Sequence, residues 1–172
     1  MIFWIASYPK SGNTWIRSLL CSYYYTDNGI FDNDSLLKNI GQFPEKKYFE
    51  KFKYDSSLPG DTAKFWIKAQ ELINKDKKIR FFKTHNFLGK IGNISFTNER
   101  NTLGAIYIVR DPRNLITSMS HHYSLNYDQA YAKLIDENAS LLEKTRDGDY
   151  SNFTFLGSWS NHYKSWKNSK DF

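Results

Sequence analysis

Residues 2–15 read IFWIASYPKSGNTW, a short apolar run followed at once by a polar loop. The run Ile2–Ser7 is typical of a buried strand, and the proline and glycine after it end that strand. From Thr14 to about Tyr24, apolar side chains recur at helical spacing, with Asn13 or Thr14 as the expected N-cap. The stretch therefore predicts a strand, a tight turn and a helix, which is how a βαβ unit begins.

The rest of the chain repeats this alternation. Two more strands are predicted, Ile79–Lys83 (IRFFK) and Ala105–Arg110 (AIYIVR), the second apolar on both faces as in buried parallel strands. Residues 26–60 are rich in turn residues. Helices are predicted over Thr62–Lys75 after an Asp61 cap, over Pro112–Tyr123 after an Asp111 cap, over about Asp128–Lys144, and from Gly157 or Ser158 to Trp166. The pattern predicts an α/β fold with a parallel sheet flanked by helices, although three strands make a thin sheet.

The composition excludes several classes of protein. With 172 residues, 40% apolar and 24% charged, the chain can bury about 70% of its unfolded surface in one domain and is not a disordered polyelectrolyte. The lone Cys21 excludes an internal disulfide framework and a cysteine-built zinc site, and it favours a reducing compartment. No apolar run approaches the roughly 18–20 residues of a membrane span, and Met1–Tyr8 lacks the basic start of a signal peptide.

The net charge of +6 favours an anionic ligand without selecting one. Nucleic acid, anionic lipid and nucleotide phosphates all fit, and so does a basic surface that serves only solubility. The basic residues are densest between Lys75 and Lys90 and do not form a terminal tail.

The loop Tyr8–Trp15 (YPKSGNTW) has the features of an anion-binding loop. Gly12 permits a tight turn, and consecutive N–H groups at a helix N-terminus attract anions. Lys10 adds a positive charge, and further donors come from Ser11, Asn13 and Thr14. The Walker spacing GxxxxGK[ST] is absent because the lysine precedes the glycine. An ordinary capped strand–helix loop is the alternative.

The loops after the other two strands carry further candidates, because open α/β sheets bind ligands beyond the carboxyl ends of their strands. In Lys83-Thr84-His85, the histidine is a candidate general base and Lys83 can stabilise developing negative charge. A hydrogen-bonded structural histidine is the alternative. Arg110 can offer a bidentate fork to a phosphate, and Ser118 follows eight residues later on the same edge. A salt-bridged strand end is the alternative there.

The other histidines give weaker signals. His121 and His122 are adjacent and point to different faces of a helix, and no acidic or cysteine partner sits at metal-ligand spacing. His162, between two tryptophans of the last predicted helix, is interpreted as a packing or surface residue.

Together and in this order, these segments resemble the cytosolic-type sulfotransferases. YPKSGNTW is similar to that family's phosphosulfate-binding loop, usually YPKSGTTW, with Asn13 in the place of a threonine. The stretch VRDPRNLITSMSHHY (109–123) resembles the family's 3′-phosphate-binding segment. KTH lies where the family keeps its catalytic base, and LGSWSNHYKSW (156–166) resembles its GSW-containing helix.

The resemblance implies a P-loop-like parallel sheet and transfer of a sulfuryl group from 3′-phosphoadenosine-5′-phosphosulfate (PAPS) to a hydroxyl or amine, without a metal. Carried over by position, the 5′-phosphosulfate would be held by Lys10, Ser11, Gly12, Asn13 and Thr14. Trp15 would lie against the adenine, and Arg110 and Ser118 would bind the 3′-phosphate. His85 would take the acceptor's proton, and Lys10 and Lys83 would neutralise charge on the transferred group. Asn13 still offers a donor and is a good N-cap.

The resemblance also implies that family members continue past the GSW helix, with another strand and a basic loop over the 3′-phosphate. We therefore expect residues 1–172 to be the N-terminal portion of one sulfotransferase domain, with a sheet incomplete at its C-terminal end. We expect this chain alone to bind the donor poorly and to turn over slowly or not at all, because charge-assisted hydrogen bonds of about 1.5–3 kcal/mol each would be lost.

Two other functions compete with this one. A P-loop kinase-like phosphotransferase would need a GKS or GKT sequence and a magnesium carboxylate, and neither is evident. A non-catalytic basic module could bind nucleotides or nucleic acid through its aromatic residues, but these sit mostly in core-like positions. We expect a cytoplasmic enzyme with a small-molecule, lipid or glycan acceptor and no nucleic-acid partner. Steroids, phenols and small amines all remain open as acceptors, and the oligomeric state is open too.

Overall fold

The computed structural model describes residues 1–169 and is built on a parallel four-stranded sheet with the order β2-β3-β1-β6. The strands are β1 (Ile2–Ser7), β2 (Gly41–Gln42), β3 (Arg80–Thr84) and β6 (Thr102–Ile108). The predicted α/β class is therefore confirmed, and β2 is an additional strand that the sequence pattern did not indicate. Arg110 lies two residues beyond the end of β6 instead of within it.

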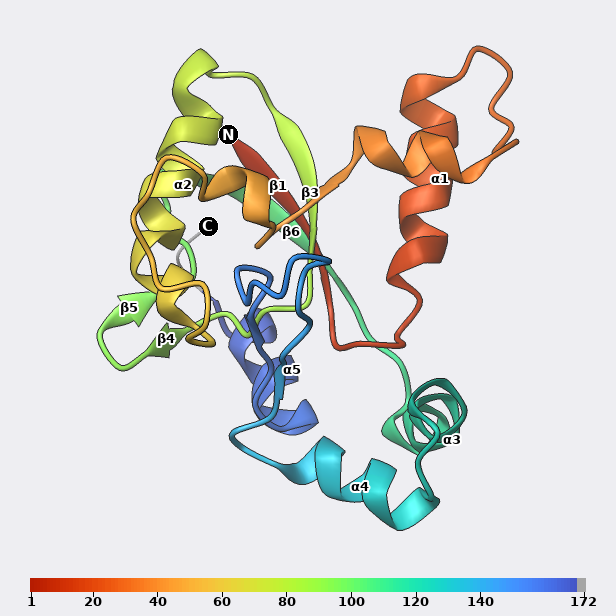
Figure 1. Cartoon of the computed structure of the whole chain (residues 1–172). Helices are drawn as coiled ribbons and strands as arrows, with labels where there is room; N and C mark the ends of the chain where they lie inside the picture. The colour runs from red at the N-terminus through yellow and green to blue at the C-terminus, as the bar shows by residue number, and fades with distance from the viewer. Residues whose placement is uncertain (170–172) are drawn as a thin grey trace.

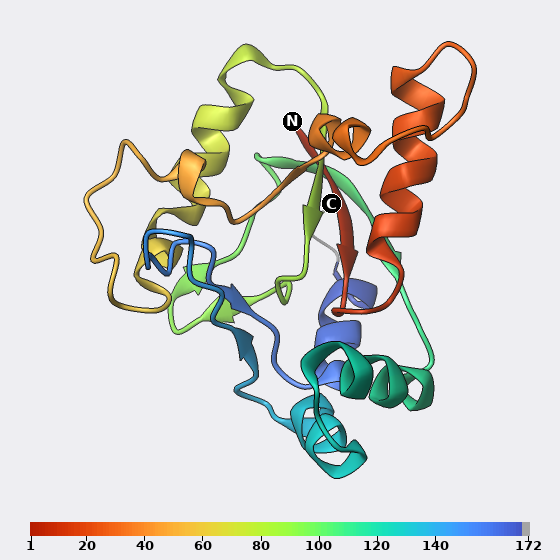
Figure 2. The ribbon, with the colours of Figure 1, turned by 45° about the vertical axis from the view of Figure 1, so that its right-hand side comes forward.

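The helices cover both faces of this sheet and one of its ends. Helices α1 (Asn13–Tyr25) and α2 (Trp66–Ile73) lie on opposite faces (Figure 1). Helices α3 (Pro112–Tyr123), α4 (Tyr127–Ile135) and α5 (Trp159–Lys167) lie beyond the end at which β1 finishes (Figures 1 and 2). Short 3₁₀ turns and hairpins join them: η1 (Asp34–Asn39), η2 (Lys46–Tyr48), η3 (Asp61–Phe65), η4 (Asn74–Asp76), β4 (Lys90–Ile91) with β5 (Ile94–Ser95), and β7 (Ser140–Leu141) with β8 (Thr154–Phe155).

Strand β1 supplies side chains to the core on both faces of the sheet, because successive strand residues point in opposite directions. Ile2, Trp4 and Ala6 are buried in the α2-side cluster, whereas Ile5 packs in the α1-side cluster with Cys21. Since β1 also lies between β3 and β6, it is paired along both edges and packed on both faces. Its loop is therefore attached to the most constrained strand of the sheet.

The single helix predicted over residues 128–144 is wrong, since α4 ends at Ile135. The Asp136 side chain accepts a hydrogen bond from the Asn138 N–H, and the Asp136 carbonyl accepts one from the Ala139 N–H. This local turn replaces the helical pattern, as aspartate side chains often do. Ser140–Leu141 then pairs with β8 instead of continuing the helix.

The helix predicted over Thr62–Lys75 is divided into η3, α2 and η4. Gly60, not Asp61, is the residue before the first turn, and the Asp61 carboxylate instead accepts the N–H of Asp55 at 2.7 Å. Within this segment Trp66 and Ala69 are buried, whereas Leu72 is 46% exposed. By contrast, Asp111 caps α3 as predicted, accepting the Arg113 N–H at 2.9 Å.

No helix among residues 1–169 combines the length and the apolar character needed to span a bilayer.

Candidate active site at the carboxyl ends of the strands

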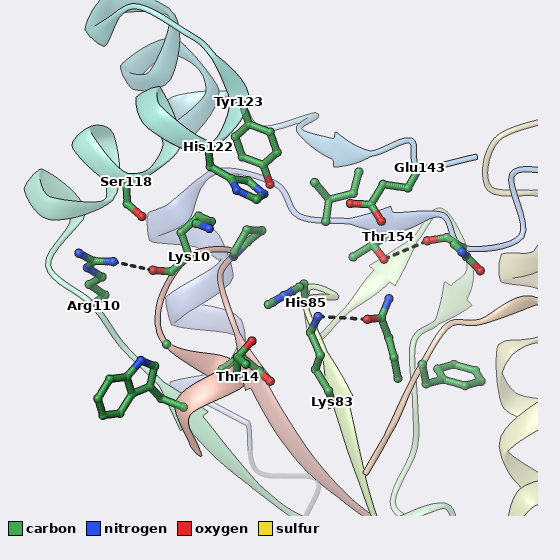
Figure 3. Close-up of a pocket in the computed structure, with 18 residues that line it drawn as sticks. Lys10, Thr14, Lys83, His85, Arg110, Ser118, His122, Tyr123, Glu143 and Thr154 are labelled. Atoms are coloured by element: carbon green, nitrogen blue, oxygen red, sulfur yellow. Dashed lines mark hydrogen bonds between the residues drawn. The ribbon is translucent and has the colours of Figure 1, made fainter. Parts of the chain in front are cut away.

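The three loops that carry the candidate residues meet in one cavity. Strands β3, β1 and β6 are parallel neighbours, so the loops after Ser7, Thr84 and Ile108 leave the same end of the sheet. The cavity between them has a volume of about 470 Å³ (Figure 3). Of the residues predicted to form the site, all but one line it: Lys10, Gly12, Asn13, Thr14, Trp15, Lys83, His85, Arg110 and Ser118. The exception is Ser11.

The loop between β1 and α1 presents an uncapped helix N-terminus to this cavity. Lys10 and Gly12 both have positive φ angles, 68° and 101°, and Gly12 is the N-cap residue of α1. The predicted N-cap role of Asn13 or Thr14 is therefore wrong, and no side chain caps the helix. The first N–H groups of a helix have no intrahelical partner, so here they remain available to an anion.

Two side chains of this loop are turned inward. The Ser11 hydroxyl is buried and has no hydrogen-bond partner among the described residues. Asn13 is also buried, and its amide nitrogen donates to the Ile5 carbonyl at 2.9 Å and to the Ser7 hydroxyl at 3.2 Å. The Asn13 backbone N–H, rather than its amide, is thus the group at this position that faces the helix end. An unpaired buried hydroxyl beside an uncapped helix fits a loop that binds an anion.

Arg110 and Ser118 lie on the side of Lys10 that is away from His85 and Lys83, as Figure 3 shows. The Arg110 guanidinium donates to the Lys10 carbonyl at 2.9 Å and is otherwise exposed. A shallower depression continues from the cavity over α3, lined by Lys10, Arg110, Asn114, Thr117, Ser118, His121 and His122. Trp15 is 78% exposed at the rim. This side of the site therefore offers positive charge, hydroxyls and one large aromatic face.

His85 and Lys83 stand on the opposite side. Burial, reinforced by the nearby Lys83 charge, lowers the pKa of His85 to about 3, so its imidazole is neutral at pH 7. Its Nδ1 lies 2.7 Å from the Ser7 carbonyl oxygen, which can only accept a hydrogen bond. Burial and then the Arg17 charge lower the pKa of Lys83 to about 8. Its ammonium donates to the Gln42 amide oxygen at 3.0 Å.

Helix α5 holds the loop after β3 in place. His162 is fully buried, and its Nε2 donates to the His85 carbonyl at 3.0 Å while its Nδ1 accepts from the Tyr107 hydroxyl at 2.8 Å. The Trp166 indole donates to the Asn86 carbonyl at 3.0 Å. The interpretation of His162 as a packing residue is therefore correct, and the GSW-containing segment braces the backbone of the candidate base.

The burial of His162 makes the fold sensitive to acid. Burial lowers its pKa to about 4, while the unfolded chain takes up this proton near pH 6.5. Between these values the unfolded state binds more protons, so the free energy of unfolding falls as the pH is lowered, by up to about 1.4 kcal/mol per pH unit. We expect urea unfolding at pH 7 and pH 5 to show this loss. His162→Gln should reduce this pH dependence, whereas His121→Gln, at an exposed position, should not. An equal change in unfolding free energy between pH 7 and pH 5 in the wild type and both variants would contradict the role of His162.

Several residues of the cavity wall were not identified from the sequence. They are Pro9, Gln42, Phe43, His122, Tyr123, Leu141, Glu143, Asn152 and Thr154. Six of them lie on or next to β2 or in the segment from β7 to β8, where no motif or spacing distinguishes them. The other three, Pro9, His122 and Tyr123, lie within the two quoted motifs but carried no predicted role in the site. His122 was noted only as a poor metal ligand. Among residues 1–169, no group of three or more His, Cys, Asp or Glu side chains is arranged to hold a metal ion.

Comparison with known proteins places the chain in a family. Three curated relatives align along nearly the whole chain. Sulfotransferase 1A1 of Rattus norvegicus is 28% identical over 167 residues, which is 94% of this chain and 47% of the relative. Sulfotransferase 1 family member D1 of Mus musculus is 26% identical over 168 residues, 94% of this chain and 46% of the relative. Sulfotransferase 1B1 of Canis lupus familiaris is 26% identical over 170 residues, 97% of this chain and 48% of the relative.

The chain thus spans about half the length of the curated relatives it matches. The family model described as "Sulfotransferase domain" matches residues 2–171, which include every loop of the cavity. On this match, the chain belongs to the sulfotransferase family.

Proposed function

We propose that residues 1–172 are a portion of a single sulfotransferase domain that binds PAPS and transfers its sulfuryl group to an acceptor hydroxyl or amine. The observation that carries this proposal is the juxtaposition, in one cavity, of the uncapped N-terminus of α1 and the neutral imidazole of His85. Such a transfer requires a site that holds the anionic donor group and a general base that takes the acceptor's proton. When bound, PAPS supplies the sulfuryl group on a phosphate leaving group.

The loop residues fit the 5′ end of this donor. The unpaired Ser11 hydroxyl, Gly12, and the N–H groups of Asn13 and Thr14 would hold the phosphosulfate, with Lys10 adding a positive charge. Arg110 and Ser118 would hold the 3′-phosphate in the depression over α3, and Trp15 would contact the adenine at the rim. All of these residues except the buried Ser11 line the cavity.

The remaining groups would act on the acceptor and on developing charge. His85 would accept the acceptor's proton at Nε2, which has no hydrogen-bond partner among residues 1–169. Lys83, with its pKa near 8, is still mainly protonated at pH 7 and can neutralise negative charge beside the base. Sulfuryl transfer resembles phosphoryl transfer, in which the protein mainly positions the reactants and compensates charge.

A Lys10→Ala variant tests the donor site. We expect the 172-residue chain to bind adenosine 3′,5′-bisphosphate in a calorimetric titration, and the variant to bind at least tenfold more weakly because one charge-assisted contact is lost. Lys68→Ala is the matched control, since Lys68 is exposed on α2, far from the cavity. Equal binding by the wild type and Lys10→Ala would contradict the assignment, and magnesium-dependent binding of adenosine triphosphate would favour a kinase-like function instead.

We also propose that this chain alone binds PAPS weakly and transfers sulfate slowly or not at all. Arg110 and Trp15, which would hold the 3′-phosphate and the adenine, are both exposed. Exposed charge contacts are weakened by solvent and salt. Transfer to phenol, amine and sugar acceptors at the rate of a full-length relative, measured side by side, would contradict this expectation.

A further inference from the structure

A chain of buried and part-buried hydrogen bonds connects the start of α1 to the imidazole of His85. The Asn13 amide donates to the Ser7 hydroxyl at 3.2 Å, and that hydroxyl lies 3.1 Å from His85 Nδ1. The Ser7 carbonyl lies 2.7 Å from the same nitrogen. Ser7 is fully buried and Asn13 nearly so. The last residue of β1 therefore presents both of its oxygens to one atom of the candidate base.

This arrangement fixes which ring nitrogen carries the proton. A carbonyl oxygen accepts hydrogen bonds and cannot donate them, so Nδ1 must hold the hydrogen that links His85 to Ser7. The imidazole is neutral, because burial keeps its pKa low. Nε2 is then left with an unshared electron pair. Figure 3 shows the His85 ring inside the cavity, beside the Lys83 side chain.

The Asn13 side chain holds the Ser7 hydroxyl in its place beside His85. Its amide nitrogen has two hydrogens, and it donates to both the Ile5 carbonyl and the Ser7 hydroxyl. The hydroxyl oxygen is thereby held on the β1 side of the imidazole. A threonine, the residue in the usual form of the loop motif, has only one hydroxyl hydrogen and a shorter side chain. It could not make both of these bonds.

We propose that Ser7 and Asn13 are positioning residues that hold His85 in the Nδ1–H tautomer, with Nε2 as the proton-accepting atom. The use of this atom in sulfuryl transfer rests on the proposed function, whereas the tautomer itself does not. Asn13 thus has a role besides the anion loop, because its side chain connects the helix end that would receive the donor to the base that would receive the acceptor's proton. Neither Ser7 nor Asn13 is proposed to touch the acceptor.

The tautomer can be measured directly on the 172-residue chain by ¹⁵N NMR of the histidine side chains at pH 7. His85→Gln identifies the resonances of His85. We expect a protonated Nδ1 and an unprotonated Nε2 in the wild type. Ser7→Ala removes the hydroxyl but leaves the carbonyl, and the Asn13 amide keeps its bond to Ile5. We expect it to shift the ratio of the two tautomers about three- to tenfold toward Nε2–H.

Matched variants separate positioning from general effects on folding. Ser22→Ala also removes a buried serine hydroxyl, one that bonds within α1 to the Ser18 carbonyl, and should leave the His85 resonances unchanged. Asn13→Thr restores the usual motif residue and should shift the tautomer ratio in the same direction as Ser7→Ala. It provides the second test if Ser7→Ala does not unfold cooperatively.

Two results would overturn the proposal: an Nε2–H tautomer in the wild type, or wild-type His85 resonances in both Ser7→Ala and Asn13→Thr. A parallel titration with adenosine 3′,5′-bisphosphate keeps this outcome separate from failure of the proposed function. Absent nucleotide binding with the expected tautomer would contradict only the proposed function. Normal binding with the wrong tautomer would contradict only the role of Ser7 and Asn13.

Discussion

Replacing Arg110 by alanine is expected to weaken the binding of adenosine 3′,5′-bisphosphate about 10- to 100-fold while changing the binding of adenosine 5′-phosphate less than about threefold. The guanidinium lies over the α3 depression, beside Ser118, and can form a bidentate, charge-assisted contact to a 3′-phosphate. Such a contact contributes about 1.5–3 kcal/mol, and each 1.4 kcal/mol is a factor of ten in affinity. Calorimetric titration with both nucleotides measures the difference.

The nucleotide without a 3′-phosphate is needed because Arg110 also has a structural contact. Its bond to the Lys10 carbonyl supports the loop that would hold the 5′ end. If Arg110 acted only through that loop, both nucleotides would lose affinity equally, and the assignment to the 3′-phosphate would be wrong. Arg100→Ala is the charge-matched control, since Arg100 is exposed just before β6 and Arg110 lies just after that strand. It should leave both affinities unchanged.

Replacing Trp4 by alanine is expected to lower the free energy of unfolding by about 3–5 kcal/mol. Trp4 is fully buried at the centre of β1, with its ring 5.1 Å from Phe96 and 5.9 Å from Phe43 between centroids. Its indole N–H donates to the Thr102 hydroxyl at 3.0 Å. The change therefore leaves a cavity and breaks a buried hydrogen bond. Since small domains are stable by only about 5–15 kcal/mol, much of the fold's stability would be lost.

Urea unfolding followed by far-ultraviolet circular dichroism measures this loss. Trp4→Phe should cost less, because it keeps most of the packing and removes only the indole bond and part of the ring. Trp15→Ala is the control for loss of a tryptophan, and its exposed position predicts a change within about 0.5 kcal/mol. A loss below about 1 kcal/mol for Trp4→Ala would mean that β1 is not the packed centre of the fold.

The sequence predicted the parts of the fold that depend on local chemistry. The apolar run of β1, the helical spacing of α1 and the Asp111–Pro112 beginning of α3 each follow from a few adjacent residues. Parallel strands then bring Lys10, His85 and Arg110 together without further information, because their loops leave the same end of the sheet. Predicting that these three residues lie close together therefore required only the correct order of strands and helices along the chain.

The parts that were missed depend on distant partners. The two-residue strand β2 exists only because Gly41 and Gln42 meet β3, and nothing in the sequence around them predicts a strand. The end of α4 depends on a turn at Asp136 and on pairing with β8. The direction of the Asn13 side chain was equally hidden, since asparagine at that position fits a helix cap by local rules. It bonds instead to Ile5 and Ser7, within the strand that precedes the loop.

The central place of β1 has a consequence for how the protein is made. Its residues are synthesised before both neighbouring strands, since Trp4 finds its hydrogen-bond partner 98 residues later and the β3 partner of Ile2 is Arg80. At roughly 5–20 residues per second, the most apolar strand waits on the order of 4–20 s for its two neighbours. During that time the apolar segment Ile2–Ala6 lacks both of its partner strands. The interval between synthesis of β1 and of β6, more than the finished fold, is then the stage at which this strand is most exposed to aggregation.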